Sequence, residues 1–214
     1  INYKNFDIII APEHDDLKGE NIISSKGAIH YITQLEINEA KNYLIDKVQN
    51  EKIVSLILGG PNKYYRFGNE ELTQVFKKIK SNFISQGHKV IVIPSMRTPK
   101  RIIDLAMKEF AKEGFVVNQV NKQAYLSALA LATTIVVTCD STSMISEAAA
   151  SGKPIFVAHM QPKKNNYRFK KFFQLFREMG ITKELGEKVD NWTYNRLNEA
   201  DRIATLMRKK LVNL

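Results

Sequence analysis

The sequence predicts an α/β protein built on a doubly wound parallel sheet. Apolar, β-branched runs alternate with amphipathic helical segments, which is typical of consecutive βαβ units. The runs expected to form the sheet are residues 53–58, 90–93, 115–120, 135–138 and 155–157. Because crossovers between parallel strands are right-handed, the polar loops after residues 58, 93 and 138 should lie along one edge of this sheet.

Helices are expected between these strands. Within residues 70–84, Leu72, Val75, Phe76 and Ile79 fall on one stripe at helical spacing. The other predicted helices cover residues 36–48, 101–112 and 122–132, and residues 192–214 are expected to be mostly one basic helix.

The apolar run FDIIIA, residues 6–11, is expected to lie outside this sheet. It comes after only five residues, and a buried strand needs neighbours. We therefore assign residues 1–32 to the last strand of a preceding domain, largely absent from this chain, followed by a polar interdomain linker. Residues 33–214 are assigned to a Rossmann-like domain.

The composition is that of a globular protein with an anionic partner. The 214 residues are 44% hydrophobic and 25% charged, with a formal net charge of +10. No zinc-finger spacing or aromatic RNA-binding signature is present, so nucleic acid is not expected. No apolar run approaches the ~20 residues that span a bilayer. The single cysteine, Cys139, fits a reducing compartment and favours a cytoplasmic location.

The stretch VVTCDSTSMISEAAASGKP gives the strongest functional signal. A β-branched strand leads into Asp140, Ser141 and Ser143, and Glu147 follows one helical turn later. Any of the first three side chains could simply cap the helix. The alternative is a ligand site, since phosphate binds at helix N-termini at the edge of parallel sheets and an acid can accept hydrogen bonds from ribose hydroxyls.

Two further loops follow predicted strands. Gly59, Gly60 and Lys63 in GGPNK could admit a phosphate, or could form a glycine turn with a solvated lysine. The dinucleotide fingerprint G-x-G-x-x-G is missing, which argues against a nicotinamide cofactor, and no cofactor is expected.

The third loop is PSMRTP. An arginine flanked by two hydroxyls suits an anion, although Thr98 followed by Pro99 could also simply begin a helix. The anion-binding candidates in this loop are Ser95, Arg97 and Thr98.

Two regions suggest other roles. His14, between Glu13 and Asp15, could transfer a proton, but the same residues could form an exposed acidic turn; adjacent residues point in different directions, so no metal site is expected. The basic stretch 163–171 adjoins a helical stripe of phenylalanines. This stripe is typical of a helix that faces the core. The alternative is that the stretch binds an acidic membrane surface or a partner through Lys163, Lys164, Phe169 and Lys170.

Taken together, the loops resemble a known family. FDIIIAPEHDD, LGGPNKYYRF, VIPSMRTP, VTCDSTSMISEAAASGKP and NWTYNRLNEADRIA resemble the mitochondrial-fission family of elongated-mitochondria proteins, which has bacterial members. The family usually carries two arginines before the threonine of the third motif, and here the first is replaced by Met96. The anion contact that the resemblance implies at this position is therefore not carried over to this chain.

The resemblance has functional implications. The family is similar to the C-terminal half of GT-B glycosyltransferases, which implies a nucleoside-diphosphate sugar, here of UDP type, held by this domain. Gly59 and Gly60 would approach its phosphates, Ser141 and Ser143 would cap the diphosphate, and Glu147 would hold the ribose. His14 would be the base or an acceptor contact. A glycosyltransferase is thus expected; the alternatives are a membrane-associated adaptor, peripheral to the inner face of the membrane, and a cofactor-free 2-epimerase of GT-B fold.

Overall fold

The computed structural model describes residues 2–48 and 52–212 and confirms the doubly wound parallel sheet. Six strands lie in the order β5-β4-β3-β6-β7-β8, and every neighbouring pair is parallel. The strands are β3 (Ile53–Leu58), β4 (Lys89–Pro94), β5 (Gly114–Val116), β6 (Thr134–Thr138), β7 (Ile155–Ala158) and β8 (Thr182–Glu184). The chain builds outward from β3 to β5 and then crosses back to β6, so the order reverses between β3 and β6.

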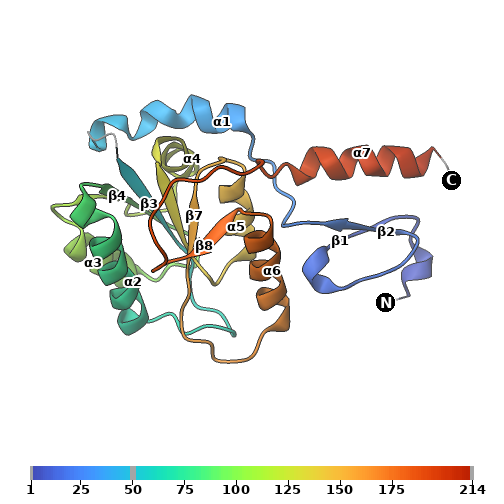
Figure 1. Ribbon diagram of the computed structural model, residues 1–214, viewed down its shortest axis with the longest axis horizontal. Helices are drawn as coiled ribbons and strands as arrows, with labels where there is room; N and C mark the ends of the chain where they lie inside the picture. The colour runs from blue at the N-terminus through green and yellow to red at the C-terminus, as the bar shows by residue number, and fades with distance from the viewer. Residues whose placement is uncertain (1, 49–51, 213–214) are drawn as a thin grey trace.

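Helices cover both faces of the sheet (Figure 1). The helices α2 (Asn69–Asn82) and α3 (Lys100–Glu109) pack together on one face. The other face carries α4 (Lys122–Leu131), α5 (Thr142–Ala149) and α6 (Tyr167–Glu178). Because both faces are covered, every residue of β3 and β6 is buried, which explains their continuous apolar sequences.

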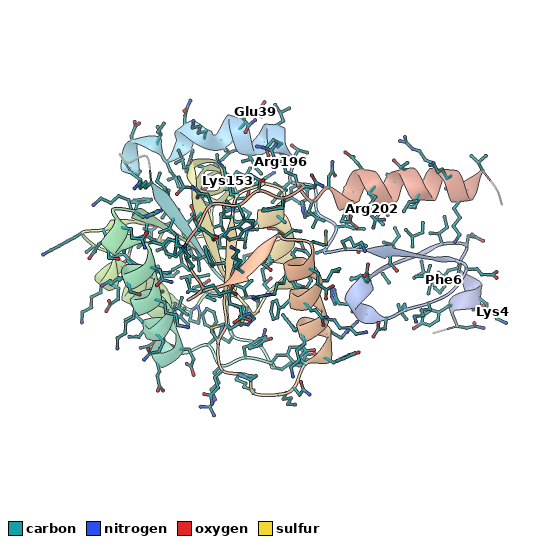
Figure 2. All side chains as sticks on the ribbon, viewed as in Figure 1. Lys4, Phe6, Glu39, Lys153, Arg196 and Arg202 are labelled. Carbon is teal, nitrogen blue, oxygen red and sulfur yellow. The ribbon has the colours of Figure 1, made fainter. Side chains whose placement is uncertain are left out.

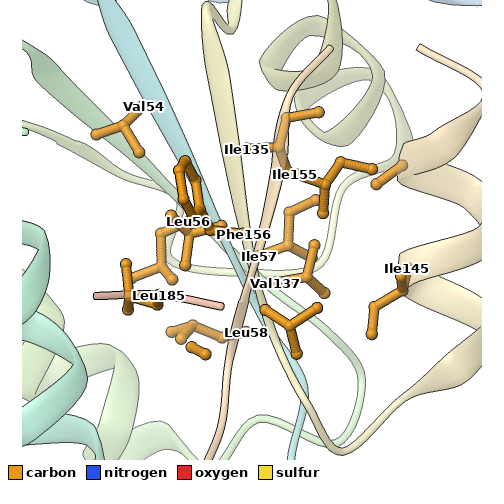
Figure 3. Packing of buried hydrophobic residues seen from close by; sticks show 14 of the residues in the cluster. Val54, Leu56, Ile57, Leu58, Ile135, Val137, Ile145, Ile155, Phe156 and Leu185 are labelled. Atoms are coloured by element: carbon orange, nitrogen blue, oxygen red, sulfur yellow. The ribbon is translucent and has the colours of Figure 1, made fainter. Parts of the chain in front are cut away.

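Buried apolar side chains pack around the two central strands (Figure 3). Leu56, Ile57 and Val137 are at most 2% exposed, and Ile145 of α5 is fully buried. On the face of α2, Phe83 packs edge to face on Phe156 with ring centroids 5.7 Å apart. Burying one such side chain stabilises the fold by about 1.5–3 kcal/mol relative to leaving it exposed. This packing holds the carboxyl ends of β3, β4 and β6 in fixed positions.

The N-terminal strand lies outside the six-stranded sheet, as expected. It is β1 (Ile9–Pro12), and it pairs in parallel with β2 (Ile22–Ser25) in a small separate sheet. The sequence analysis placed β2 in a polar linker, so this pairing was missed. The helix α7 (Glu199–Leu211) lies beside the pair, and both termini are at this end of the molecule (Figure 1).

Side chains of α7 hold the small sheet in place. Glu199 is buried and accepts a hydrogen bond from the Lys26 amide at 2.6 Å. Arg202, labelled in Figure 2 between α7 and the strands, donates to the Ser24 carbonyl at 2.6 Å and also pairs with Glu199. The small sheet therefore depends on residues almost 180 positions away in sequence.

Several elements differ from the sequence predictions. The helix expected over 36–48 is only α1 (Gln34–Glu39), followed by the short 3₁₀ segments η3 (Ala40–Tyr43) and η4 (Ile45–Lys47). The Ser127 hydroxyl accepts from the Leu44 amide and donates to the Lys41 carbonyl. At these two residues the backbone groups thus bond to a side chain of another element. The strand expected over 115–120 is shorter, and β8 was not predicted. Residues 192–198 precede α7 without helical structure.

Candidate functional site

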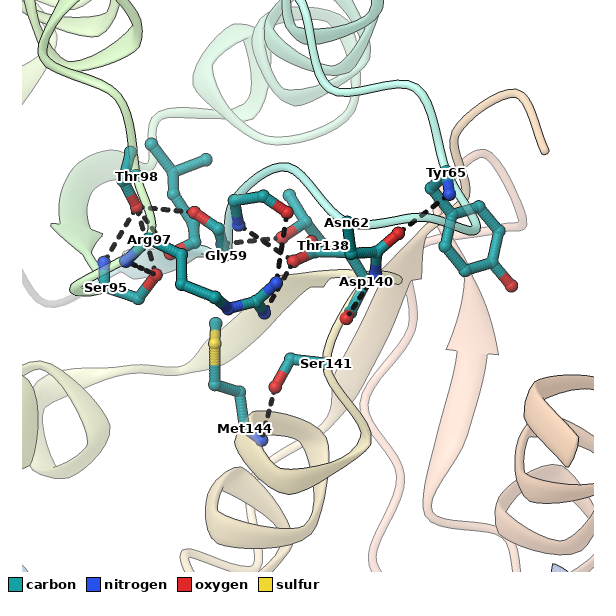
Figure 4. A network of polar contacts seen from close by, with 12 residues as sticks. Gly59, Asn62, Tyr65, Ser95, Arg97, Thr98, Thr138, Asp140, Ser141 and Met144 are labelled. Atoms are coloured by element: carbon teal, nitrogen blue, oxygen red, sulfur yellow. Dashed lines mark hydrogen bonds and ion pairs between the residues drawn. The ribbon is translucent and has the colours of Figure 1, made fainter. Parts of the chain in front are cut away.

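Three loops meet at the carboxyl edge of the adjacent strands β4, β3 and β6 (Figure 4). Gly59 and Gly60 follow β3, Ser95 follows β4, and Asp140 lies just beyond β6. The backbone amide of Ser95 donates to the Leu58 carbonyl at 3.0 Å, which joins the first two loops. The sequence prediction that these loops share one edge is therefore confirmed.

Asp140 is the centre of the loop network. Its side chain is fully buried, and Oδ2 accepts from the Gly60 amide at 2.8 Å and from Arg97 Nη2 at 2.9 Å. Burial raises the pKa of this carboxyl, and the bond from Gly60 and the charge of Arg97 act in the opposite direction. Oδ1 has no hydrogen-bond partner in the part of the chain that the structure describes. The carboxylate is thus placed beneath the loops, where it positions Arg97.

The two glycines make room for this network. A Cβ atom on Gly59 would lie 2.0 Å from Asp140 Oδ2, and one on Gly60 would lie 2.1 Å from the Arg97 carbonyl oxygen. Neither glycine has a positive φ, so the requirement is space rather than backbone conformation. The close neighbours of both residues are protein groups, and their predicted contact with phosphate stays a prediction.

The loop after β4 presents Arg97 at the surface. The Thr98 hydroxyl lies 2.5 Å from the Gly59 carbonyl oxygen and accepts from the Ser95 amide at 2.9 Å, so it holds two loops together. The Arg97 side chain is 43% exposed. Its Nη1 donates to the Gly60 carbonyl, in addition to the ion pair with Asp140. A guanidinium has five N–H donors, so several remain for an anion.

The start of α5 supports both interpretations made from the sequence. Ser141 is the N-cap, and its hydroxyl accepts from the Met144 amide at 3.4 Å. Capping therefore explains this residue. Ser143 is exposed, and the first amides of any helix have no partner within it. The first turn of α5, in which Ser143 is exposed and the other residues are half-buried, faces the same loop network as Arg97 (Figure 4), which suits an anion.

A cavity of about 350 Å³ lies beside this network. Glu147 lines it, together with Ser95 and Met96 from the loop after β4 and Met144 from α5. The remaining lining residues are mostly apolar or aromatic: His30, Tyr31, Ile32, Ile57, Ile93, Pro94, Val120, Asn121, Lys122 and Tyr125. A mainly apolar cavity with a few polar groups is typical of a small-molecule site.

Glu147 is held by a tyrosine that the sequence analysis missed. The Tyr125 hydroxyl donates to Glu147 Oε2 at 3.0 Å. Burial raises the pKa of Glu147, and the bond from Tyr125 and the nearby His30 lower it. Tyr125 lies in an apolar helix, where the sequence gives no sign of a polar role. His30, Tyr31 and Ile32 come from the predicted linker and were likewise missed.

The remaining residues of the loop after β3 are placed around the network. Asn62 donates to the Asp140 carbonyl at 3.0 Å, and its Oδ1 accepts from the amides of Tyr64 and Tyr65. Lys63 is exposed, with Nζ 5.0 Å from the centre of the Tyr64 ring. Asn62 is thus a further structural residue of this loop that was not singled out from the sequence.

His14 is placed elsewhere. It belongs to the 3₁₀ turn η2 (Glu13–Asp15) and packs edge to face on Phe172 of α6, with ring centroids 5.4 Å apart. Burial lowers its pKa; Asp15 acts to raise it and Arg168 to lower it. His14 is not among the residues that line the cavity beside Glu147. Its predicted role as a base or acceptor contact stays a prediction.

The basic stretch is partly absorbed by the fold. Lys163 Nζ donates to the Asn62 carbonyl at 3.0 Å, and Phe169 is half-buried against Tyr65, with ring centroids 5.3 Å apart. Phe172 is fully buried, so the phenylalanine stripe faces the core. Lys164 and Lys170 are exposed. A role in membrane or partner binding for Lys163, Lys164, Phe169 and Lys170 therefore stays a prediction. The apolar member of this set, Phe169, packs inward against Tyr65.

Neither a metal cluster nor a membrane-spanning helix is present among the described residues. Over 2–48 and 52–212, no group of three or more His, Cys, Asp or Glu side chains is arranged to hold a metal ion. No helix in the same ranges is long and apolar enough to span a bilayer.

The fold is that of a Rossmann-like domain of GT-B type. A solved structure of the UDP-GlcNAc 2-epimerase from Methanocaldococcus jannaschii, in complex with UDP-GlcNAc and UDP, matches with a TM-score of 0.51. The sequences are 13% identical, and the match covers 95% of this chain and 61% of the epimerase. At this identity the likeness concerns the fold alone.

The chain belongs to the mitochondrial fission ELM1 family, whose model matches residues 1–211. It is 29% identical to an uncharacterised protein of Rickettsia prowazekii, over 92% of this chain and 57% of that protein. It is 24% identical to the mitochondrial fission protein ELM1 of Arabidopsis thaliana, over 96% of this chain and 55% of that protein. The chain thus spans little more than half the length of these relatives.

Proposed function

We propose that this domain binds a nucleoside-diphosphate sugar of UDP type, and that the protein is a glycosyltransferase with an acceptor of unknown identity. The observation that carries the proposal is the position of Glu147. Its carboxylate lines an open cavity at the carboxyl edge of the sheet, one helical turn from the exposed start of α5. An acid and an anion site at this separation match the ribose and the phosphates of one nucleotide.

The parts of the ligand can be assigned to parts of the site. The diphosphate would meet the first turn of α5 at Ser143 and the spare donors of Arg97. The ribose would lie beside Glu147, and the base would occupy the apolar part of the cavity near Ile93 and Val120. Lys63, exposed on the neighbouring loop, would add a further positive charge.

The fold likeness supports this proposal in one respect. The epimerase with which the fold is shared was solved with UDP-GlcNAc and UDP, so the same architecture holds that ligand class in another protein. The adaptor alternative has less support, because Phe169 and Phe172 pack inward. His14 remains the candidate base, to be tested by turnover of the His14→Gln variant with a donor and an acceptor.

Calorimetry tests the binding proposal directly. The chain is titrated with UDP, CDP, ADP, GDP and UDP-GlcNAc up to millimolar concentration, and one nucleotide should bind. Glu147→Gln should weaken binding by about 1.5–3 kcal/mol, which is the range for a hydrogen bond to a charged group. The matched control is Glu39→Gln, since Glu39 is exposed and lies outside the cavity. Absence of binding by all five ligands would refute the proposal.

A further inference from the structure

Two loops at the carboxyl edge of the sheet are fixed to each other outside the cavity. One follows β3 and the other follows β7, and they run antiparallel where they meet. The Arg66 amide donates to the Gln161 carbonyl at 2.9 Å. The Lys163 amide donates to the Tyr64 carbonyl at 2.7 Å. The exposed side chains of the two loops therefore lie close together.

The surface that these loops share is basic. Its cations are exposed side chains from both loops, which we call the basic patch: Lys63, Arg66, Lys163 and Lys164. No Asp or Glu occurs in residues 59–69 or 159–177, which include both loops. In the part of the chain that the structure describes, none of these cations forms an ion pair. Like charges gathered without counter-ions destabilise a fold, and they attract anions from solution. The charge of the basic patch therefore fits an anionic partner.

Asn62 connects the basic patch to the loop network around Asp140. Its side-chain amide donates to the Asp140 carbonyl at 3.0 Å (Figure 4), and its backbone carbonyl accepts from Lys163 Nζ at 3.0 Å. An ammonium group has three donors, so Lys163 keeps two of them for a ligand. No residue of the basic patch lines the cavity beside Glu147. The patch is thus adjacent to the proposed nucleotide site but outside its cavity.

The aromatic side chains near the patch have partners within the protein. Phe169 packs on Tyr64 and Tyr65, with ring centroids 5.6 and 5.3 Å apart. Tyr167 is exposed, but Lys171 Nζ lies 4.6 Å from the centre of its ring. Segments that lie on membranes combine basic residues with apolar side chains that enter the lipid. Charge without such a side chain favours a polyanion in solution over a bilayer.

We infer that the basic patch binds the acceptor of the proposed glycosyl transfer, and that this acceptor carries phosphate groups. The inference rests on the proposed function, because it names the chemical class of the second substrate. Several cations on two loops match several negative charges, and both guanidinium and ammonium groups bind phosphate oxygens. In the transfer, an acceptor hydroxyl oxygen forms a bond to the anomeric carbon while the bond from that carbon to the diphosphate breaks. UDP leaves with the bonding electrons, and the hydroxyl proton passes to a base.

The experiment uses inorganic tripolyphosphate as the probe, because it carries several phosphate charges and has no base or ribose for the cavity. Calorimetry follows its titration into the chain at a saturating concentration of UDP, so that the donor site is already occupied. Tripolyphosphate should still bind, and its affinity should fall as the salt concentration rises. The triple variant Arg66→Gln, Lys163→Gln, Lys164→Gln should lose about tenfold or more of this affinity, because three weak contacts are removed together. Its affinity for UDP should stay within about twofold of that of the unmodified chain. Lys63 is kept, since it is also assigned to the donor phosphates.

The matched control is the triple variant Lys77→Gln, Arg208→Gln, Lys209→Gln. It removes the same charge from exposed residues of α2 and α7, and it should keep both affinities. If tripolyphosphate and UDP compete for one site, or if both triple variants lose the same affinity for tripolyphosphate, the inference is overturned while the proposed function stands. If UDP does not bind the unmodified chain, the proposed function fails and the acceptor assignment fails with it.

Two other ligands test different partners for the basic patch. Sedimentation with vesicles of phosphatidylcholine and phosphatidylglycerol tests a membrane surface, and an oligothymidylate with as many phosphates as a matched polyphosphate tests nucleic acid. Neither should bind more tightly than the polyphosphate. Vesicle binding that is lost in the patch variant would assign the patch to a membrane, and tighter binding of the oligothymidylate would assign it to nucleic acid. Either result overturns the inference.

Discussion

Gly59→Ala provides a sharp test of the loop network. The added Cβ atom would lie 2.0 Å from Asp140 Oδ2 and 2.5 Å from Oδ1, and these two atoms and Cγ of Asp140 are its three nearest neighbours. The carboxylate is buried and held by the Gly60 amide and Arg97, so it cannot move without losing those bonds. The new Cβ atom therefore either overlaps the Asp140 carboxylate or displaces it from its hydrogen bonds.

The cost follows from these two terms. Overpacking a core position costs about 1–3 kcal/mol, and each hydrogen bond to a charged group that is lost adds about 1.5–3 kcal/mol. We therefore expect the free energy of unfolding to fall by about 2.5–6 kcal/mol when one such bond is lost. For a chain of this size that is a decrease of about 5–24 °C in Tm.

The assay is thermal and urea unfolding followed by circular dichroism. The control is Gly19→Ala, where the nearest atoms to the new Cβ are the side-chain ends of Asn21 and Ile22, at 3.2 and 3.3 Å. Its Tm should stay close to that of the unmodified chain.

A double variant identifies the source of the clash. If the overlap is with Asp140, the pair Gly59→Ala and Asp140→Ala should be no more than about 1 kcal/mol less stable than Asp140→Ala alone. Additive losses of stability in the double variant would refute the reasoning. So would a Tm of Gly59→Ala within about 2 °C of that of the unmodified chain, which corresponds to roughly 1 kcal/mol or less.

Three further predictions concern the site and the core. Arg97→Lys should weaken binding of UDP by about tenfold or more, because one ammonium cannot replace the guanidinium fork. Calorimetry measures this, and Arg101→Lys, on an exposed residue outside the cavity, should have no effect. Phe172→Ala should lower the free energy of unfolding by about 3–5 kcal/mol, whereas the exposed Tyr167→Ala on the same helix should cost less than about 1 kcal/mol in the same urea titration. The raised pKa of Glu147 means that the folded state binds the carboxyl proton more tightly than the unfolded state does. Protonated Glu147 therefore stabilises the folded state fully at a pH below its ordinary pKa of 4.5. This stabilisation is lost as the pH rises through the pKa of the folded state. The Tm of the unmodified chain minus that of Glu147→Gln should therefore fall from pH 4 towards neutrality, and a constant or rising difference would contradict the assignment.

The sequence was sufficient for the architecture where the pattern is local. The runs from Ile53 to Leu58 and from Thr134 to Thr138 are mostly apolar because both faces of the sheet are covered, and this pattern is visible without coordinates. The strand β8 has only three residues at the sheet edge, and its Lys183 is half-buried and its Glu184 exposed, so nothing distinguishes it from a loop. The strand β2 was hidden in a polar segment for a similar reason.

The candidate site was predictable to the extent that its parts come from one strand–turn–helix unit. Asp140, Ser141 and Glu147 stand within eight positions of one another, and their chemistry is apparent from the spacing. The partners of these residues come from distant segments: Tyr125 from an apolar helix and His30 from a connection. The role of Gly59 was also recognised only in part, since a glycine that admits a ligand and one that admits a buried carboxylate look identical in sequence.

The small sheet of β1 and β2 has a consequence for the order of folding. Two parallel strands alone bury too little surface to persist in water. Their cover is α7, through Glu199 and Arg202, and a ribosome adds these residues nearly 180 positions after Ser24. Chains acquire structure from the N-terminus during synthesis, but here β1 and β2 must wait for α7, which follows the six-stranded sheet in sequence. The pair is thus completed after that sheet, and its edges stay open throughout translation of the six-stranded sheet.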